Sequence, residues 1–181
     1  GNGGNVFNST STLVCSGSGY LMTGNVTADV FNGDATFTNI GSNIIYLGYN
    51  SANNQFNGNI IVNSTSGNGV YFSTTASGSS ILASGKTISV GGSGFTFGSL
   101  ILQNFTQLSS TPQSLTLTNV AALTMGPNST FNGNVNFVAP QVYLNGTTYN
   151  GTAYIEKNGA TNNAGNGGNV FNSTSTLVCS G

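Results

Sequence analysis

The chain has 181 residues and almost no charge: two lysines, three acidic residues and no histidine, so charged residues make up 3% of the sequence. Without a basic patch, the electrostatic basis of nucleic-acid binding is missing. No run approaches the ~20 apolar residues that a membrane-spanning helix needs. Apolar residues amount to 37% and occur in short bursts, unlike the polar, highly charged composition of disordered chains.

The opening segment of the chain returns without a single change near the other end. Residues 1–17 and 165–181 are identical, an offset of 164 positions (165 − 1). Such repetition decides the architecture, because each unit of a repeat protein packs on its neighbours. We therefore interpret residues 1–164 as one complete long repeat and residues 165–181 as the start of the next, within a longer array.

A shorter motif recurs inside the long repeat. Phe-Asn-Gly occurs at residues 31–33, 56–58 and 131–133, with close variants at 7–9 and 149–151. Weaker members lack the Asn-Gly pair and have leucine in place of the aromatic residue. The landmarks, spaced 18 to 26 residues apart, are Phe7, Phe31, Phe56, Leu82, Leu108, Phe131, Tyr149 and Phe171. This spacing predicts about seven coils per long repeat.

Between the landmarks lie short, alternating runs of β-branched and aromatic residues, which are typical of strands. These runs cover residues 35–38, 60–62, 87–90 and 115–118. Gly, Asn and Ser separate them, and we expect the Asn-Gly pairs to form turns that need a positive φ. Residues 107–113, which contain Pro112, are predicted to be irregular, and residues 121–125 are the best candidate for a helical turn.

These patterns predict an all-β fold, a parallel β-solenoid (β-helix) of about seven coils per 164-residue repeat. The alternative is a series of β-sandwich repeat domains, because Asn-Gly is also the strongest short hairpin signal. In the solenoid, an internal column would hold Phe7, Phe31, Phe56, Leu82, Phe131, Tyr149 and Phe171, and a ladder of turn amides would hold Asn8, Asn32, Asn57, Asn132 and Asn150. Stacked amides hydrogen-bond along the axis of repeating β structures.

Groups for catalysis or metal binding are scarce. With no histidine, acid–base chemistry would fall to the carboxylates, of which Asp29 and Asp34 are the closest pair in sequence. Glycoside hydrolysis requires a carboxylate pair, but Asp34 also occupies the position that Asn59 and Asn134 fill in other motifs. We favour that structural interpretation and predict no enzyme activity, no metal site and no cofactor.

Cys15 and Cys179 are one position of the repeated segment, seen twice. Seven coils at ~4.8 Å each would separate them by ~34 Å along the axis, whereas a disulfide requires Cα atoms within ~7 Å. They therefore cannot bond to each other in this fold. The position is interpreted as a buried free thiol, with an interchain disulfide between laterally packed copies as the alternative.

Several segments resemble a known type of repeat. They are Gly-Gly-Asn-Val-Phe-Asn (3–8), Phe-Asn-Gly-Asp (31–34), Gln-Phe-Asn-Gly-Asn-Ile (55–60), Leu-Ala-Ser-Gly-Lys-Thr-Ile (82–88) and Tyr-Asn-Gly-Thr-Ala-Tyr-Ile-Glu-Lys-Asn-Gly (149–159). Together they resemble the long, near-identical repeats of giant β-strand-repeat surface proteins of Bacteroidota. The resemblance implies export and display as a long fibre, as in mobile adhesins or prey-catching filaments. It supplies no catalytic or binding residue, and the low charge departs from most such repeats.

The sequence thus favours a structural role, as a shaft repeat of an extracellular or cell-surface filament or giant adhesin. The repeats would stack end to end on copies of themselves, and their near-neutral surface offers little repulsion to lateral bundling. The main alternative is a module that binds surface glycans through exposed aromatic rings, with Tyr46, Tyr49, Tyr143 and Tyr149 as candidates. A polysaccharide-acting β-helix enzyme built on the two aspartates is the distant alternative.

Overall fold

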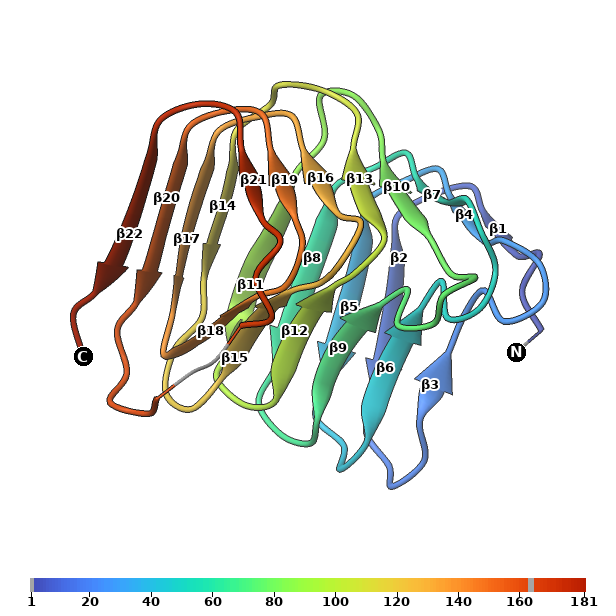
Figure 1. Cartoon of the computed structure of the whole chain (residues 1–181). Coiled ribbons are helices and arrows are strands. Elements are labelled where there is room, and N and C mark those ends of the chain that lie inside the picture. The colour runs from blue at the N-terminus through green and yellow to red at the C-terminus, as the bar shows by residue number, and fades with distance from the viewer. Residues whose placement is uncertain (1, 163–164) are drawn as a thin grey trace.

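The computed structural model describes residues 2–162 and 165–181. All helical or strand structure in these residues is β-strand, and the strands wind around one long axis with the chain ends at opposite ends of the molecule (Figure 1). The predicted parallel β-solenoid is therefore confirmed. The described residues contain no helix with the length and apolar character of a membrane span.

The strands form four parallel sheets. Sheet 1 contains β1 (Val6–Phe7), β4 (Val30–Phe31), β7 (Asn54–Phe56), β10 (Ser80–Leu82), β13 (Phe105–Gln107), β16 (Thr130–Phe131), β19 (Thr148–Tyr149) and β21 (Val170–Phe171). Sheet 2 contains β2 (Ser11–Cys15), β5 (Ala35–Asn39), β8 (Ile60–Ser64) and β11 (Ile88–Phe95). Sheet 3 contains β3 (Leu21–Met22), β6 (Ile44–Leu47), β9 (Gly69–Phe72), β12 (Ser99–Leu102), β15 (Ala122–Met125) and β18 (Gln141–Leu144). Sheet 4 contains β14 (Gln113–Thr116), β17 (Val135–Ala139), β20 (Ala153–Lys157) and β22 (Ser175–Cys179).

Successive strands visit three sides of the solenoid in turn. Within each sheet, neighbouring strands lie one coil apart and pair in parallel, as β1 does with β4 and β2 with β5. Sheets 2 and 4 follow one another along the same side (Figure 1). Parallel neighbours a whole coil apart exclude the β-sandwich alternative, because hairpins would make consecutive strands antiparallel.

Alternation along the strands builds one apolar interior. In β5, Ala35, Phe37 and Asn39 are buried, whereas the intervening threonines are partly exposed. The largest fully buried side chains are Tyr149, Phe31, Phe37, Phe56, Phe72, Phe95, Phe105, Phe131 and Phe137. Since these side chains lie between stacked coils, no coil has a core of its own, and burial depends on the coil before and the coil after.

The glycines of the Asn-Gly turns permit close stacking of the coils. Gly33, Gly58, Gly133 and Gly151 do not have positive φ, so the sequence-based expectation for these turns is wrong. A Cβ atom on any of them would lie 2.2–2.5 Å from backbone atoms of the preceding coil. Glycine is therefore required by the approach of one backbone to another, and not by the φ angle.

One irregular coil interrupts the side shared by sheets 2 and 4. Strand β11 pairs with β8 from Ile88 to Val90, shifts register and pairs again at Phe95. The buried Gln113 side chain of β14 bridges to the start of β11: its Oε1 accepts from the Ile88 N–H at 2.8 Å, and its Nε2 donates to the Lys86 carbonyl at 3.1 Å. A side-chain amide thus satisfies backbone groups at the start of β11, where β11 and β14 do not pair within one sheet.

Two local expectations need correction. Residues 121–125 form no helical turn, because β15 covers Ala122–Met125 and pairs with strands on both sides. The segment expected to be irregular, 107–113, begins and ends in strands, and only residues 108–112 lie between them. Leu108 is not a member of the internal column: its side chain is 53% exposed, and Gln107 lies beside Leu82 instead.

Candidate functional site: the repeated coil and its columns

The inward side chains of sheet 1 form a column dominated by stacked aromatic rings. Phe7 stacks on Phe31 with ring centroids 4.5 Å apart and planes 3° apart, and Phe31 stacks on Phe56 at 5.0 Å and 2°. Tyr149 stacks on Phe171 at 4.9 Å and 6°. The strand register places the seven predicted members in this column: Phe7, Phe31, Phe56, Leu82, Phe131, Tyr149 and Phe171.

The column changes composition at β13, where two positions are exchanged. Gln107 lies beside Leu82 in the ring column, and Phe105 lies beside Ser80 two residues earlier. Both side chains are fully buried. The Phe105 ring still contacts Phe131, with centroids 5.9 Å apart, and the Gln107 Oε1 accepts from the Gly133 N–H at 3.1 Å. A landmark search that expects an apolar residue here finds the exposed Leu108 instead.

The asparagines of the turns form two hydrogen-bonded ladders on the surface. In the first, Asn32 donates to Asn8 at 3.0 Å and Asn57 donates to Asn32 at 2.9 Å. In the second, Asn150 donates to Asn132 and Asn172 donates to Asn150, both at 2.7 Å. Every bond runs from the amide nitrogen of the later coil to the amide oxygen of the earlier one, so each ladder has a direction along the axis.

A second internal column, which was not predicted from the sequence, lies two residues before the rings. Its polar members are Asn5, Asp29, Asn54, Ser80, Ser129, Thr147 and Asn169. The fully buried Asp29 accepts from the backbone N–H of Asn5 at 2.7 Å and of Gly24 at 2.6 Å. The available signal was the polar-x-aromatic spacing, as in Asn5-Val6-Phe7.

The repeated segment occurs in two environments with the same backbone. Strands β1 and β2 recur as β21 and β22, with identical sequences. The Gly-Gly pairs that precede them have positive φ in both copies, 89° and 78° at residues 3–4 and 75° and 74° at residues 167–168. The segment therefore folds in the same way whether its neighbouring coil lies after it or before it.

Exposure differs between the two copies. Cys15 is 6% exposed beneath β5, whereas Cys179 is exposed. Leu13 is half-buried, whereas Leu177 is 57% exposed. Since the sequences are identical, the surroundings account for the difference: β5 covers the first copy, which also continues into the rest of its own coil at Gly19. Covering this segment with another coil therefore buries apolar side chains.

The contacts of the two copies complement one another. The ring at this position stacks on the preceding coil in one copy (Phe171 on Tyr149) and on the following coil in the other (Phe7 on Phe31). The next residue donates through its amide nitrogen to the preceding coil as Asn172, and accepts through its amide oxygen from the following coil as Asn8. The two hydrogen bonds therefore use different atoms of the same asparagine side chain.

The cysteine of the repeated segment is a free thiol in both copies. In the copy covered by a following coil, the Cys15 Sγ donates to the Gly19 carbonyl at 3.3 Å. A thiol buried in this way cannot reach a second chain without local unfolding. The environment of Cys15 therefore favours the free-thiol interpretation over an interchain disulfide.

The candidate carboxylates make backbone contacts. Asp34 accepts from the Asn59 N–H at 2.7 Å, and Asn59 and Asn134 accept from the next coil in the same way, at 3.1 and 2.9 Å. Asp29 is fully buried, so a substrate has no access to it. In residues 2–162 and 165–181, no three His, Cys, Asp or Glu side chains are gathered as a metal site would need.

The tyrosines proposed as glycan contacts occupy different environments. Tyr149 is fully buried in the ring column, so its assignment to an exposed binding surface is wrong. Tyr46 lies on the outer face of sheet 3, edge-on to Tyr49 at 5.0 Å and to Tyr71 at 5.7 Å. Desolvation, together with the neighbouring tyrosines, raises the pKa of Tyr46. Tyr143 belongs to β18 of the same sheet.

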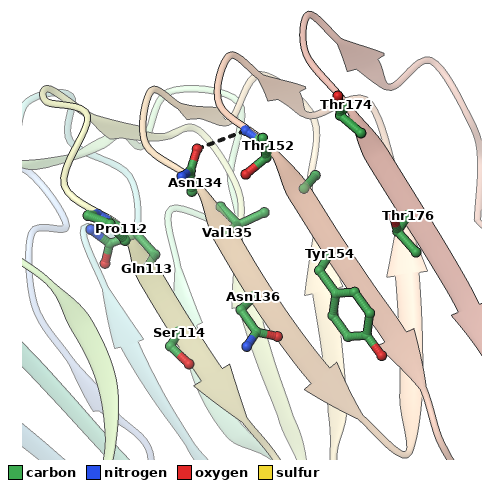
Figure 2. A pocket seen from close by; sticks show the side chains of 11 residues that line it. Pro112, Gln113, Ser114, Asn134, Val135, Asn136, Thr152, Tyr154, Thr174 and Thr176 are labelled. Atoms are coloured by element: carbon green, nitrogen blue, oxygen red, sulfur yellow. Dashed lines mark hydrogen bonds between the residues drawn. The ribbon is translucent and has the colours of Figure 1, made fainter.

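An open groove of about 500 Å³ lies on the outer face of sheet 4 (Figure 2). The register of four strands aligns one row of its lining, Ser114, Asn136, Tyr154 and Thr176. A second row beside it contains Asn134, Thr152 and Thr174. The groove was not predicted from the sequence, because its residues differ in type and belong to four separate coils.

No protein-family model, curated protein or solved structure matches this chain. The resemblance to the repeats of giant Bacteroidota surface proteins therefore remains a prediction from the motifs.

Proposed function

We propose that this chain is a shaft repeat of a long filament or giant adhesin, in which identical repeats continue one β-solenoid. The observation that carries the proposal is the repeated coil, whose two copies have the same backbone and complementary contacts. A coil that pairs with the preceding coil in one copy, and with the next coil in the other, can do both at once in an array.

The buried polar column would cross the junction between repeats without a gap. As Asn169, the side-chain oxygen accepts from the Thr147 N–H of the preceding coil at 3.1 Å. As Asn5, the backbone N–H and the side-chain amide donate to Asp29 of the following coil at 2.7 and 2.9 Å. As Asn169, the amide nitrogen also donates to the Leu144 carbonyl at 3.2 Å. Because an amide nitrogen carries two hydrogens, one asparagine can satisfy both neighbours.

Such a shaft would act as a stiff spacer. Coils stacked at ~4.8 Å make a repeat of seven coils ~34 Å long, and the strands lie across the fibre axis. The resemblance to surface-protein repeats supports an extracellular or cell-surface location, and the scarcity of charge supports lateral association between shafts. The proposal assigns no catalytic residue and no cofactor.

Chains containing one, two and three complete repeats test the proposal. Small-angle X-ray scattering should show the maximum dimension growing by ~34 Å per repeat at constant cross-section. Each added repeat should raise the free energy of unfolding by more than the free energy of unfolding of a single repeat, because it also adds a junction interface. Jointed particles, or repeats that unfold independently with the stability of a single repeat, would contradict the continuous solenoid.

A junction variant makes the same test more specific. In a two-repeat chain, Phe171→Asp places a charge between the rings of Tyr149 and the following coil, where it lacks a partner. We expect the two repeats to uncouple, with separate unfolding transitions. The matched control, Tyr143→Asp on the outer face of sheet 3, should leave them coupled.

A further inference from the structure

We propose that the groove on sheet 4 is a binding site for a neutral polysaccharide, with the Tyr154 ring as its stacking platform. The site lies between the last coils of the long repeat and β22 of the repeated segment, all within the present chain, and it does not depend on the shaft proposal. It is also separate from the tyrosine cluster on sheet 3, which centres on Tyr46.

The lining of the groove carries no charge. Its side chains are Ser, Thr, Asn, Gln, Pro, Val, Ala and Tyr, and none of them is ionised at neutral pH. A charged ligand would lose hydration there without gaining a partner of opposite sign. The absence of charge in the lining therefore selects an uncharged ligand.

The outward side chains offer both kinds of contact that a sugar ring needs. The Tyr154 side chain is 38% exposed in the middle of the aligned row, where the apolar C–H face of a sugar can pack on the ring (Figure 2). On either side of it, Asn136 and Thr176 are exposed and make no side-chain hydrogen bond to the described residues. Their amide and hydroxyl groups both donate and accept, as sugar hydroxyls do.

The platform is held in place before a ligand arrives. The Tyr154 hydroxyl donates to Glu156 Oε2 at 2.7 Å, and the Ser180 hydroxyl donates to Glu156 Oε1. The bond from Ser180, and then that from Tyr154, lowers the pKa of Glu156, whereas the bond to Glu156 raises the pKa of Tyr154. Fixing the ring in advance reduces the conformational entropy lost on binding.

The shape of the site favours a polymer over a small sugar. The aligned row has one side chain per strand, from β14 to β22, with neighbours ~4.8 Å apart along the axis. An extended chain lying along the axis meets all four side chains, whereas a single sugar meets one or two. If the shaft proposal also holds, the groove recurs in every repeat and binding becomes multivalent.

The test uses the present chain, labelled with ¹⁵N, and a panel of neutral oligosaccharides: cello-, manno-, xylo-, malto- and laminarihexaose. Hexagalacturonate is the anionic comparison. We expect at least one neutral hexasaccharide to shift the amide signals of Asn136 and Tyr154, and hexagalacturonate to shift neither. Tyr154→Ala should weaken binding by about tenfold. Tyr154→Phe, which keeps the ring, should lose less.

Tyr143→Ala, on the outer face of sheet 3, is the control and should bind as the unmodified chain does. The proposal is overturned if no neutral hexasaccharide in the panel binds, if the shifts centre on Tyr46 and Tyr71, or if Tyr143→Ala weakens binding as much as Tyr154→Ala. Stronger binding of hexagalacturonate would also overturn it. Because the test involves no second complete repeat, a negative result leaves the stacking of repeats untouched.

Discussion

Tyr149 stacks on Phe171 with ring centroids 4.9 Å apart and planes 6° apart, and beside this contact its hydroxyl is buried without a hydrogen-bond partner. The nearby Thr147 hydroxyl donates to the Gly126 carbonyl instead, at 2.9 Å. The stacked ring of Tyr149 therefore stabilises the column, whereas its buried hydroxyl destabilises it. A buried polar group without a partner costs about 1–3 kcal/mol.

Replacing Tyr149 by phenylalanine should make the protein more stable. The variant Tyr149→Phe keeps the ring contacts with Phe131 and Phe171 and removes the unpaired hydroxyl, so the free energy of unfolding should rise by about 1 kcal/mol. Urea denaturation followed by circular dichroism measures the change. Tyr143→Phe, at a partly exposed position, should change stability little. A loss of stability in Tyr149→Phe would show that the hydroxyl has a partner in solution.

The same hydroxyl predicts how stability depends on alkaline pH. Desolvation by burial raises the pKa of Tyr149 well above its ordinary value of 10.0. The polar side chain of the neighbouring Thr147 lowers this pKa, but by less than desolvation raises it. The unfolded chain therefore loses this proton first as the pH rises above about 10. The free energy of unfolding should then fall by up to about 1.4 kcal/mol per pH unit for this group.

Tyr149→Phe should remove this part of the pH dependence. Denaturation between pH 9 and 11.5 should give a shallower slope for the variant than for the unmodified chain. Desolvation also raises the pKa of Tyr71, so some slope should remain in both proteins. Identical slopes would mean that Tyr149 ionises in the folded state as readily as in the unfolded state.

The glycines of the Asn-Gly turns provide a matched pair of variants. A Cβ atom at Gly58 would lie 2.3 Å from the backbone of Gly33, whereas a Cβ atom at Gly92 would meet nothing within 4 Å. Gly58→Ala should cost about 1–3 kcal/mol or more, because the two backbones have to separate. Gly92→Ala should be neutral or slightly stabilising. Thermal unfolding compares them, and equal melting temperatures would contradict the close stacking.

The coil period could be predicted from the sequence because aromatic residues and Asn-Gly pairs recur together. Phe31 and Phe56 carry the same signal, and both lie in the ring column. The signal fails at β13, where Phe105 and Gln107 exchange places, because only the three-dimensional register shows which residue faces Leu82. A single-sequence pattern contains no information about that register.

The sequence predicted where individual residues lie better than why each residue type is required at its position. Gly58 looks like a turn glycine, yet its requirement comes from a contact with Gly33 in the preceding coil. Tyr149 fits both the internal column and an exposed aromatic surface, and only its burial decides between them. Asp29 was considered as a catalytic carboxylate, although its partners are backbone N–H groups and the amide of Asn5.

Asp29 and Asn54 are neighbours in the polar column, and we predict that they cannot exchange identities. Asp29 faces donors only, because Asn5 and Gly24 direct three N–H groups at its carboxylate. Asn54 uses its amide nitrogen to donate to the carbonyls of Ser51 at 2.6 Å and Ser79 at 3.0 Å. Asp29→Asn would turn an NH₂ group toward N–H donors, and Asn54→Asp would turn a carboxylate toward carbonyl oxygens.

Each variant should therefore destabilise the fold by about 1–3 kcal/mol, even though each residue is tolerated one coil away. Chemical denaturation of the two single variants and of the double exchange measures the costs. The double exchange should recover nothing, because the mismatches are with backbone groups and the Asn5 amide, and not between the two exchanged side chains. Recovery of stability in the double variant would mean that contacts between the two side chains stabilise the column, and that the backbone at Gly24, Ser51 and Ser79 adapts to them.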